Sequence, residues 1–177
     1  MRKHEDRCSF KKFKCPQVNC EANLIIPEVV DHIKNVHKGV FNNMKAVIPW
    51  MLERKGRNVE KGEEVFRSDV NWQPSITIFD GHTFLFNACV KDLNWKGWAI
   101  VIGDKKIAQK YEVSMMAIGH SAQVTVWGDV YSLDIDVKDI LDDWKGVLEI
   151  NNNMARKLVR LRTDGRDIRV KYELRHK

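Results

Sequence analysis

The stretch that decides the fold of the N-terminal part runs from Cys15 to His37 and reads Cys-Pro-Gln-Val-Asn-Cys-Glu-Ala-Asn-Leu-Ile-Ile-Pro-Glu-Val-Val-Asp-His-Ile-Lys-Asn-Val-His. Its spacing, Cys-x4-Cys-x11-His-x4-His, falls within that of structural zinc sites, where two thiolates come from a turn and two imidazoles from a helix. We therefore predict that Cys15, Cys20, His32 and His37 bind one Zn2+ ion. Four protein ligands leave no position for a reactive water, so the zinc is expected to be structural.

The residues around these ligands indicate a ββα finger whose helix carries both histidines. Leu24 and Val29 stand where such a finger places its small apolar core. Pro27 suits a first helical turn, which leaves its N–H groups without partners, and Gly39 suits a helix end. Two histidines five residues apart lie about 140° apart around an ideal helix. The last turn is therefore expected to loosen so that both imidazoles reach one metal ion.

A partial metal motif precedes the finger. His4-x3-Cys8 has the spacing of the closing half of a second zinc site, whose opening cysteine pair is not in the sequence. The alternative is an exposed helix that happens to carry a thiol. His4 and Cys8 are therefore candidate ligands of a remnant site.

The sequence after the finger changes to short β-type runs separated by turns, so we divide the chain into residues 1–39 and 40–177. The spacing of the runs favours an antiparallel β-sandwich, and turn dipeptides such as Asp80-Gly81 favour hairpins. Only Val137–Trp144 and Asn151–Leu161 look helical, while Val40–Lys55 looks like a packed connection. The predicted strands are Glu64–Arg67, Ser75–Phe79, Thr83–Leu93, Trp98–Gly103, Tyr111–Ile118, Gln123–Val130 and Asp167–Leu174. The fold class is mainly β.

Composition limits the compartment and the class of partner. The chain has no apolar N-terminal signal and no apolar run near the roughly 20 residues of a membrane span. We expect a cytoplasmic or nuclear protein, in which four cysteines are metal ligands or core thiols rather than disulfides. A net charge of +6 keeps a single-finger nucleic-acid-binding protein open as an alternative. The apolar finger helix favours docking on protein instead.

No nucleophile elbow, P-loop or dinucleotide fingerprint is present, so we assign no catalytic residue. Cys89 lies in a predicted strand and is expected to be a buried apolar side chain. An enzyme with an undetected site remains a third class, and it would need a pocket of perturbed titratable groups.

Taken together, the motifs resemble the seven in absentia (SINA/SIAH) family of ubiquitin ligases. The most specific part is His4-x3-Cys8-x6-Cys15-Pro16-x3-Cys20-x11-His32-x4-His37, which looks like the end of the family's first finger and its complete second finger. Weaker matches include Gly81-His82-Thr83-Phe84, Gly119-His120 and Thr125-Val126-Trp127. The resemblance implies SIAH-type zinc fingers, a TRAF-like sandwich that holds substrates, and a homodimer or a heterodimer with relatives.

The resemblance also sets expectations for activity. The family's RING cysteines are not in this sequence, so ubiquitin transfer is in doubt. We expect either the substrate-recognition part of a ligase in ubiquitin-dependent degradation or a RING-less adaptor. The family binds an extended peptide along a sheet edge, and Trp72, Ile76 and Ile78 are the residues nominated for that contact; the alternative is that they are ordinary core or edge residues.

Overall fold

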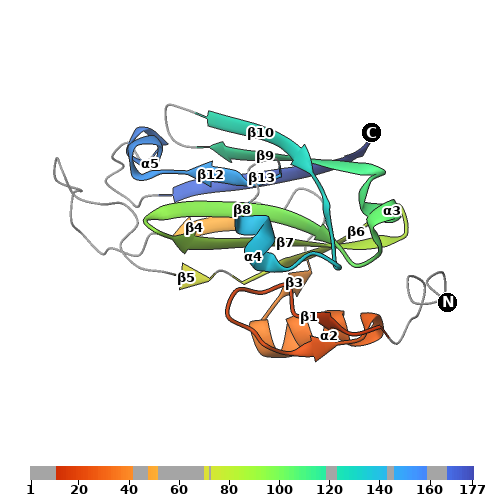
Figure 1. Cartoon of the computed structure of the whole chain (residues 1–177). Coiled ribbons are helices and arrows are strands. Elements are labelled where there is room, and N and C mark those ends of the chain that lie inside the picture. Colours follow the sequence, from red (N-terminus) through yellow and green to blue (C-terminus); the bar gives the residue numbers. More distant parts are fainter. Residues whose placement is uncertain are drawn as a thin grey trace.

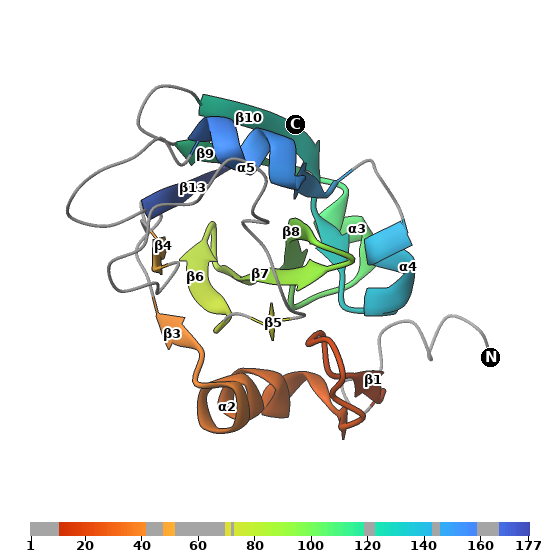
Figure 2. The same cartoon turned by 90° about the vertical axis from the view of Figure 1, so that its left-hand side faces the viewer.

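The protein is built in three layers, shown in the computed structural model in Figure 1. The structure describes residues 11–41, 48–51, 70–71, 73–118, 123–142, 146–158 and 167–177. A small ββα unit forms the lowest layer in the view of Figure 1, and two β-sheets lie above it. The turned view in Figure 2 shows the same order of layers. The predicted mainly β sandwich preceded by a small finger-like unit is therefore confirmed.

The sheet next to the ββα unit has seven strands. Its order is β11 (Tyr131–Ser132), β8 (Asn94–Val101), β7 (His82–Lys91), β6 (Ser75–Phe79) and β3 (Val40–Phe41), while β12 (Leu148–Ile150) pairs with β8 and β5 (Val70–Asn71) pairs with β7. Most pairs are antiparallel, but β11 runs parallel to β8 and β3 runs parallel to β6. The sandwich is thus antiparallel at its centre and parallel at two short edges.

The second sheet has four strands in the order β10 (Gln123–Asp129), β9 (Tyr111–Ile118), β13 (Asp167–His176) and β4 (Ile48–Met51). Three short helices connect the strands, namely α3 (Lys105–Ala108), α4 (Val137–Asp142) and α5 (Asn152–Leu158). None of the helices in the described residues is long and apolar enough to cross a membrane.

Alternate residues of the central strands feed two separate apolar cores, because successive side chains of a strand point to opposite faces. On β7, Phe84 and Phe86 pack between the two sheets, whereas Leu85 and Cys89 face the ββα unit. In the inner core the ring of Phe86 stacks on that of Tyr172, with ring centroids 3.5 Å apart. The seven-stranded sheet is therefore covered on both faces.

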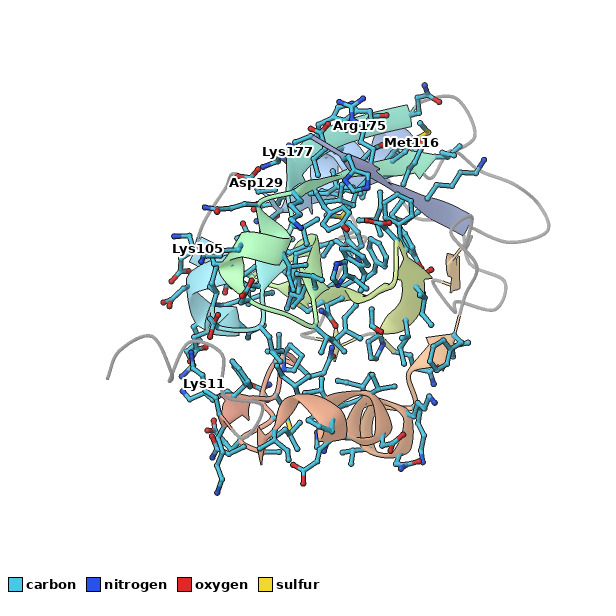
Figure 3. The ribbon with its side chains drawn as sticks, turned by 90° about the vertical axis from the view of Figure 1, so that its right-hand side faces the viewer. Lys11, Lys105, Met116, Asp129, Arg175 and Lys177 are labelled. Atoms are coloured by element: carbon cyan, nitrogen blue, oxygen red, sulfur yellow. The ribbon has the colours of Figure 1, made fainter. Side chains whose placement is uncertain are left out.

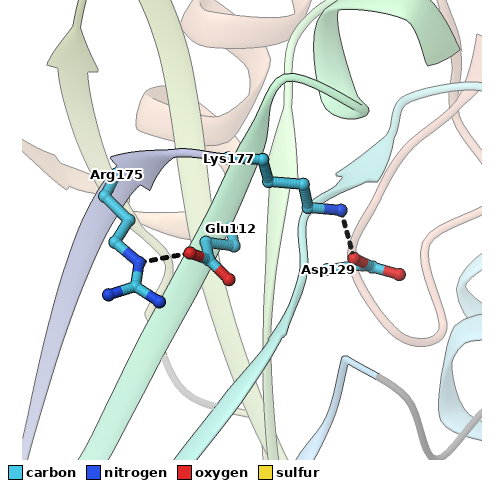
Figure 4. Close-up of polar contacts among 4 residues, drawn as sticks. All are labelled: Glu112, Asp129, Arg175 and Lys177. Carbon is cyan, nitrogen blue, oxygen red and sulfur yellow. Dashed lines mark hydrogen bonds and ion pairs between the residues drawn. The ribbon is translucent and has the colours of Figure 1, made fainter.

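The outer face of the four-stranded sheet carries charged side chains in pairs. Arg175 of β13 contacts Glu112 of β9, and Lys177 contacts Asp129 of β10, as Figure 4 shows. The guanidinium group of Arg175 also lies 3.8 Å from the ring centroid of Trp127. Figure 3 shows Arg175, Lys177 and Asp129 on this sheet, far from Lys11 beside the ββα unit. The four-stranded sheet thus has one face in the core and one exposed to solvent.

Several predicted boundaries need correction. Most predicted strands are present, but the strand predicted as Trp98–Gly103 is β8, which begins earlier, at Asn94, and ends at Val101. The stretch predicted as a connection, Val40–Lys55, contributes the edge strands β3 and β4. Pro49 is compatible with β4 because an edge strand leaves one row of N–H groups unpaired. The predicted strand Glu64–Arg67 lies outside the described residues.

Both predicted helices are present, and the residues predicted to end them, 143–144 and 159–161, lie outside the described residues. The described part of α4 ends at Asp142, and α5 begins at Asn152 rather than at Asn151, whose side chain accepts a hydrogen bond from the Met154 N–H at 2.9 Å. Asn151 therefore caps α5.

The cover that the ββα unit provides gives a prediction for stability. Leu85 is fully buried between β7 and the ββα unit, so Leu85→Ala is expected to lower the free energy of unfolding by about 2–5 kcal/mol. The matched control Leu93→Ala changes a leucine that is 38% exposed, and it should change stability by about 0.5 kcal/mol or less. Urea unfolding measures both. Equal effects of the two substitutions would show that the ββα unit does not cover Leu85.

Candidate metal centre

The four predicted ligands come from a turn and a helix of the ββα unit. The unit consists of β1 (Phe13–Lys14), β2 (Asn23–Leu24) and α2 (Ile26–His37). The turn between the strands is closed by two backbone hydrogen bonds, from Cys15 N–H to Ala22 C=O at 2.8 Å and from Cys20 N–H to Gln17 C=O at 3.2 Å. Asn19 adopts the left-handed conformation, with φ of 64°. This turn brings the two thiols to the same side of the unit.

Helix α2 begins and ends at positions that the sequence marks. Pro27 lies in its first turn, and the Glu28 carboxylate accepts a hydrogen bond from the Ile25 N–H at 3.1 Å. At the other end Lys38, not Gly39, adopts the left-handed conformation, with φ of 57°. Gly39 is required for space instead, because a Cβ there would lie 2.6 Å from a methyl carbon of Ile33. The prediction that a glycine ends this helix was right in place, but the physical reason is close packing.

The structure brings all four predicted ligands together. Their ligand atoms lie within 4.8 Å of one another. The Cys15 sulfur is 3.3 Å from His37 Nε2, and the Cys20 sulfur is 3.5 Å from His32 Nε2. The two Nε2 atoms are 3.2 Å apart, although the histidines are five residues apart on the helix. His37 is the last helical residue, and its ring meets that of His32 edge to face.

These distances can be tested against the shape of a tetrahedral metal site. With metal–nitrogen bonds of about 2.05 Å and metal–sulfur bonds of about 2.3 Å, two nitrogens lie about 3.3 Å apart and a nitrogen lies about 3.6 Å from a sulfur. The distances between His32, His37 and their cysteine neighbours agree with these values to about 0.3 Å. Three of the six distances between ligand atoms therefore match those of a tetrahedral metal site, and all six lie within 4.8 Å.

Burial tunes the acidity of the ligands. It raises the pKa of the Cys15 thiol to about 12, although a hydrogen bond from the Gln17 N–H acts in the opposite direction. Burial, followed by the neighbouring His32, lowers the pKa of His37. A metal binds the thiolate and the neutral imidazole. His37 thus favours its ligand form, whereas Cys15 must lose its proton to the solvent when a metal binds.

The ββα unit is attached to the seven-stranded sheet by apolar and polar contacts. Val29 and Ile33 of α2 are fully buried, in one cluster with Leu85, Trp98 and Ile100 of the sheet. At the rim of this interface, Lys11 and Lys14 form ion pairs with Asp134 and Asp136, at 2.6 and 2.8 Å. The metal cluster therefore lies in a unit that shares a core with the sandwich.

The other predicted site residues have mixed outcomes. His4, Cys8 and Trp72 lie outside the described residues, so the remnant metal site stays a prediction. The Ile76 side chain is buried in the core beneath the ββα unit, which leaves no surface of it for a peptide. The side chain of Ile78, on the same strand, is 62% exposed. Peptide contact along β6 stays a prediction that now depends on Ile78.

Two polar residues next to the metal cluster were missed by the sequence reading. Gln17 lies between the two cysteines, and its side-chain amide donates a hydrogen bond to Asn87 of β7. The signal was visible in the sequence, since Asn87 is the one polar residue in the apolar run Phe84–Val90. The partner of that residue could not be found without the fold.

Comparison with known proteins gives a distant but extended similarity. The chain is 24% identical to the putative E3 ubiquitin-protein ligase SINAT1 of Arabidopsis thaliana, over 86% of this chain and 49% of that protein. It is 23% identical to the E3 ubiquitin-protein ligase SINAT4 of the same plant, over 93% of this chain and 51% of that protein. No family model matches the chain.

The similarity is distant but runs along most of the chain. It covers the ββα unit together with the sandwich and supports a distant relationship to SINA-type ubiquitin ligases. The chain spans about half the length of these relatives.

The geometry of the cluster predicts one bound metal ion per chain. Elemental analysis of the purified protein should find that ion, and the double variant Cys15→Ser, Cys20→Ser should lose it, because a serine hydroxyl is a poor replacement for a thiolate ligand. Cys89→Ala is the matched control, since Cys89 is a buried thiol on β7 outside the cluster. A parent protein that folds without metal, or a double variant that keeps it, would contradict this assignment.

Proposed function

We propose that the chain is the protein-recognition part of a SINA-type ubiquitin ligase, or an adaptor related to it, and that its ββα unit holds a structural zinc ion. The observation that carries the proposal is the similarity to two plant E3 ubiquitin-protein ligases along nearly the whole chain, ββα unit and sandwich together. Transfer of ubiquitin is not assigned to any residue of this chain. Its role is to bring a bound protein to the transfer machinery.

Zinc is proposed because of the donor set and the spacing. Two thiolates and two imidazoles in a tetrahedron are typical of structural zinc sites. All four donors belong to the protein, which leaves no coordination position for a substrate or a reactive water. None of the cysteines that the structure describes is in a disulfide, in keeping with a reducing cytoplasmic or nuclear compartment, which we propose for the protein.

Recognition is proposed to use strand addition beside residues 77–79 of β6, which lie beyond the two residues of β6 that pair with β3. Ile78 exposes an apolar side chain near the end of this strand, and Phe41 of the neighbouring strand β3 is 49% exposed. The ammonium group of Lys34 lies 4.4 Å from the ring centroid of Phe41. An extended peptide that pairs with a strand gains main-chain hydrogen bonds, and alternate side chains give it specificity. An apolar side chain of the peptide would then meet Ile78.

A second copy, or a relative, is proposed as a further partner. Strand β10 is the end strand of its sheet in the described part of the chain, and Gln123–Gly128 carries no charged residue. Such an edge is open to pairing with another strand. If β10 pairs antiparallel with its own copy about Val126, Trp127 lies opposite Thr125 of the partner copy, an aromatic and β-branched pair.

The structure gives no support for the nucleic-acid alternative. Exposed positions of α2 include Glu28 and Asp31, whose charge opposes the approach of phosphate. Lys11 and Lys14 are paired with acidic residues of the sandwich.

The recognition proposal can be tested with a displayed library of random 12-residue peptides. Peptides enriched on the parent protein are expected to bind Ile78→Glu at least about tenfold more weakly, because a charge replaces the apolar contact. A tenfold loss of affinity corresponds to about 1.4 kcal/mol of binding free energy. Leu93→Glu, which changes an exposed leucine in the β7–β8 turn, should bind them as the parent does. No enrichment on the folded parent, or equal binding to both variants, would contradict the proposal.

A further inference from the structure

Gln17 occupies a special position in the turn that carries the two cysteines. Its backbone N–H donates a hydrogen bond to the Cys15 sulfur, and its C=O accepts one from the Cys20 N–H at 3.2 Å. Both cysteines are therefore hydrogen-bonded to the main chain of a single residue, Cys15 through its sulfur and Cys20 through its backbone N–H. The position of Gln17 thus bears on where both cysteines lie relative to the histidines.

The side chain of the same residue leaves the ββα unit and enters the sandwich. Gln17 Nε2 donates a hydrogen bond to Asn87 Oδ1 of β7, seventy residues further along the chain. Both residues are almost fully buried, with 5% of Gln17 and 3% of Asn87 exposed. Water therefore cannot easily replace either partner.

Within the described part of the chain, the Asn87 side chain has no hydrogen-bonding partner other than Gln17. It is paired across the sheet with Trp98, and both side chains lie on the face that the ββα unit covers. No residue that the structure describes accepts a hydrogen bond from Asn87 Nδ2 or from Trp98 Nε1. The amide of Asn87 is thus held in an apolar interface with Gln17 as its hydrogen-bonding partner among those residues.

Attachment of the ββα unit to the sandwich does not by itself explain why a buried hydrogen bond lies at the cysteine turn. The rim of the interface already has two ion pairs, Lys11–Asp134 and Lys14–Asp136, at positions open to solvent. The Gln17–Asn87 bond differs because it is buried and because it ends on the residue whose main chain is hydrogen-bonded to both cysteines. Residues that orient metal ligands from outside the first coordination shell commonly change metal affinity by about 10–100-fold when they are replaced.

We propose that Gln17 and Asn87 are positioning residues of the metal centre, so that strand β7 of the sandwich holds the cysteine turn in its metal-binding shape through one buried amide–amide hydrogen bond. This inference rests on the proposed metal site. It makes metal affinity and the packing of the sandwich depend on each other, because a coupling between two sites acts equally in both directions. The sandwich is then part of the metal site rather than a neighbour of it.

The test uses the full chain loaded with Co2+, whose visible absorption reports a tetrahedral site, and Zn2+ as a competitor. Gln17→Leu and Asn87→Leu remove the hydrogen bond while keeping the volume of the side chain nearly constant. Each is expected to weaken Co2+ binding by about 10–100-fold and to shift its absorption bands. The double variant should bind Co2+ no more weakly than whichever single variant has the lower affinity, because both changes remove the same hydrogen bond. Far-UV circular dichroism checks that each variant is folded.

Asp134→Asn is the matched control, since it removes an ion pair of the same interface that does not touch the cysteine turn. Co2+ affinity and bands should be those of the parent. Folded Gln17→Leu that binds Co2+ within about twofold of the parent would overturn the inference, even if Asn87→Leu fails to fold. An equal loss in Asp134→Asn would also overturn it, because general docking would then explain the effect. Absence of Co2+ binding by the parent would instead overturn the proposed metal centre.

Discussion

The arrangement depends on one constraint, which is that an apolar face of the seven-stranded sheet must be kept from water by a ββα unit too small to fold by itself. The unit has a single short helix and two strands of two residues each, so it buries little apolar surface of its own. It shares a core with the sheet, and the proposed metal ion would hold its four ligands together. Folding units of this size usually obtain most of their stability from the metal, with apparent binding free energies of about 10–16 kcal/mol.

The double cover explains the composition of the central strands. Strands β7 and β8 contribute Phe84 and Val101 to one core and Leu85 and Ile100 to the other. A sheet covered on both faces reads as a continuous apolar run instead of an alternating one. Among the described residues, the sheet surfaces that remain open are edges and the outer face of the four-stranded sheet. Recognition of other proteins is therefore proposed at the part of β6 beyond β3 and at the edge strand β10.

The sequence was most informative where chemistry fixes the spacing of residues. The metal ligands, Pro27 and the Asn151 cap each follow from a local rule, and the strand β9 follows from turn and period signals. Contacts between residues far apart in the sequence could not be predicted from local patterns. Examples are the hydrogen bond between Gln17 and Asn87 and the burial of Ile76 beneath the ββα unit. The edge strands β3 and β4 were missed because they have only two and four residues, too few to show the alternation of a strand, and β4 contains a proline. The role of Gly39 was misread because close packing against Ile33 leaves no trace in the sequence.

The central claim is that the metal centre and the sandwich form one cooperative unit. The most direct test is equilibrium unfolding in urea, followed by far-UV circular dichroism of the sandwich, at a series of buffered free Zn2+ concentrations. The account predicts a single transition whose free energy of unfolding rises by about 1.4 kcal/mol for each tenfold increase in free Zn2+ above the dissociation constant. A sandwich transition that stays at the same urea concentration, with and without Zn2+, would contradict it.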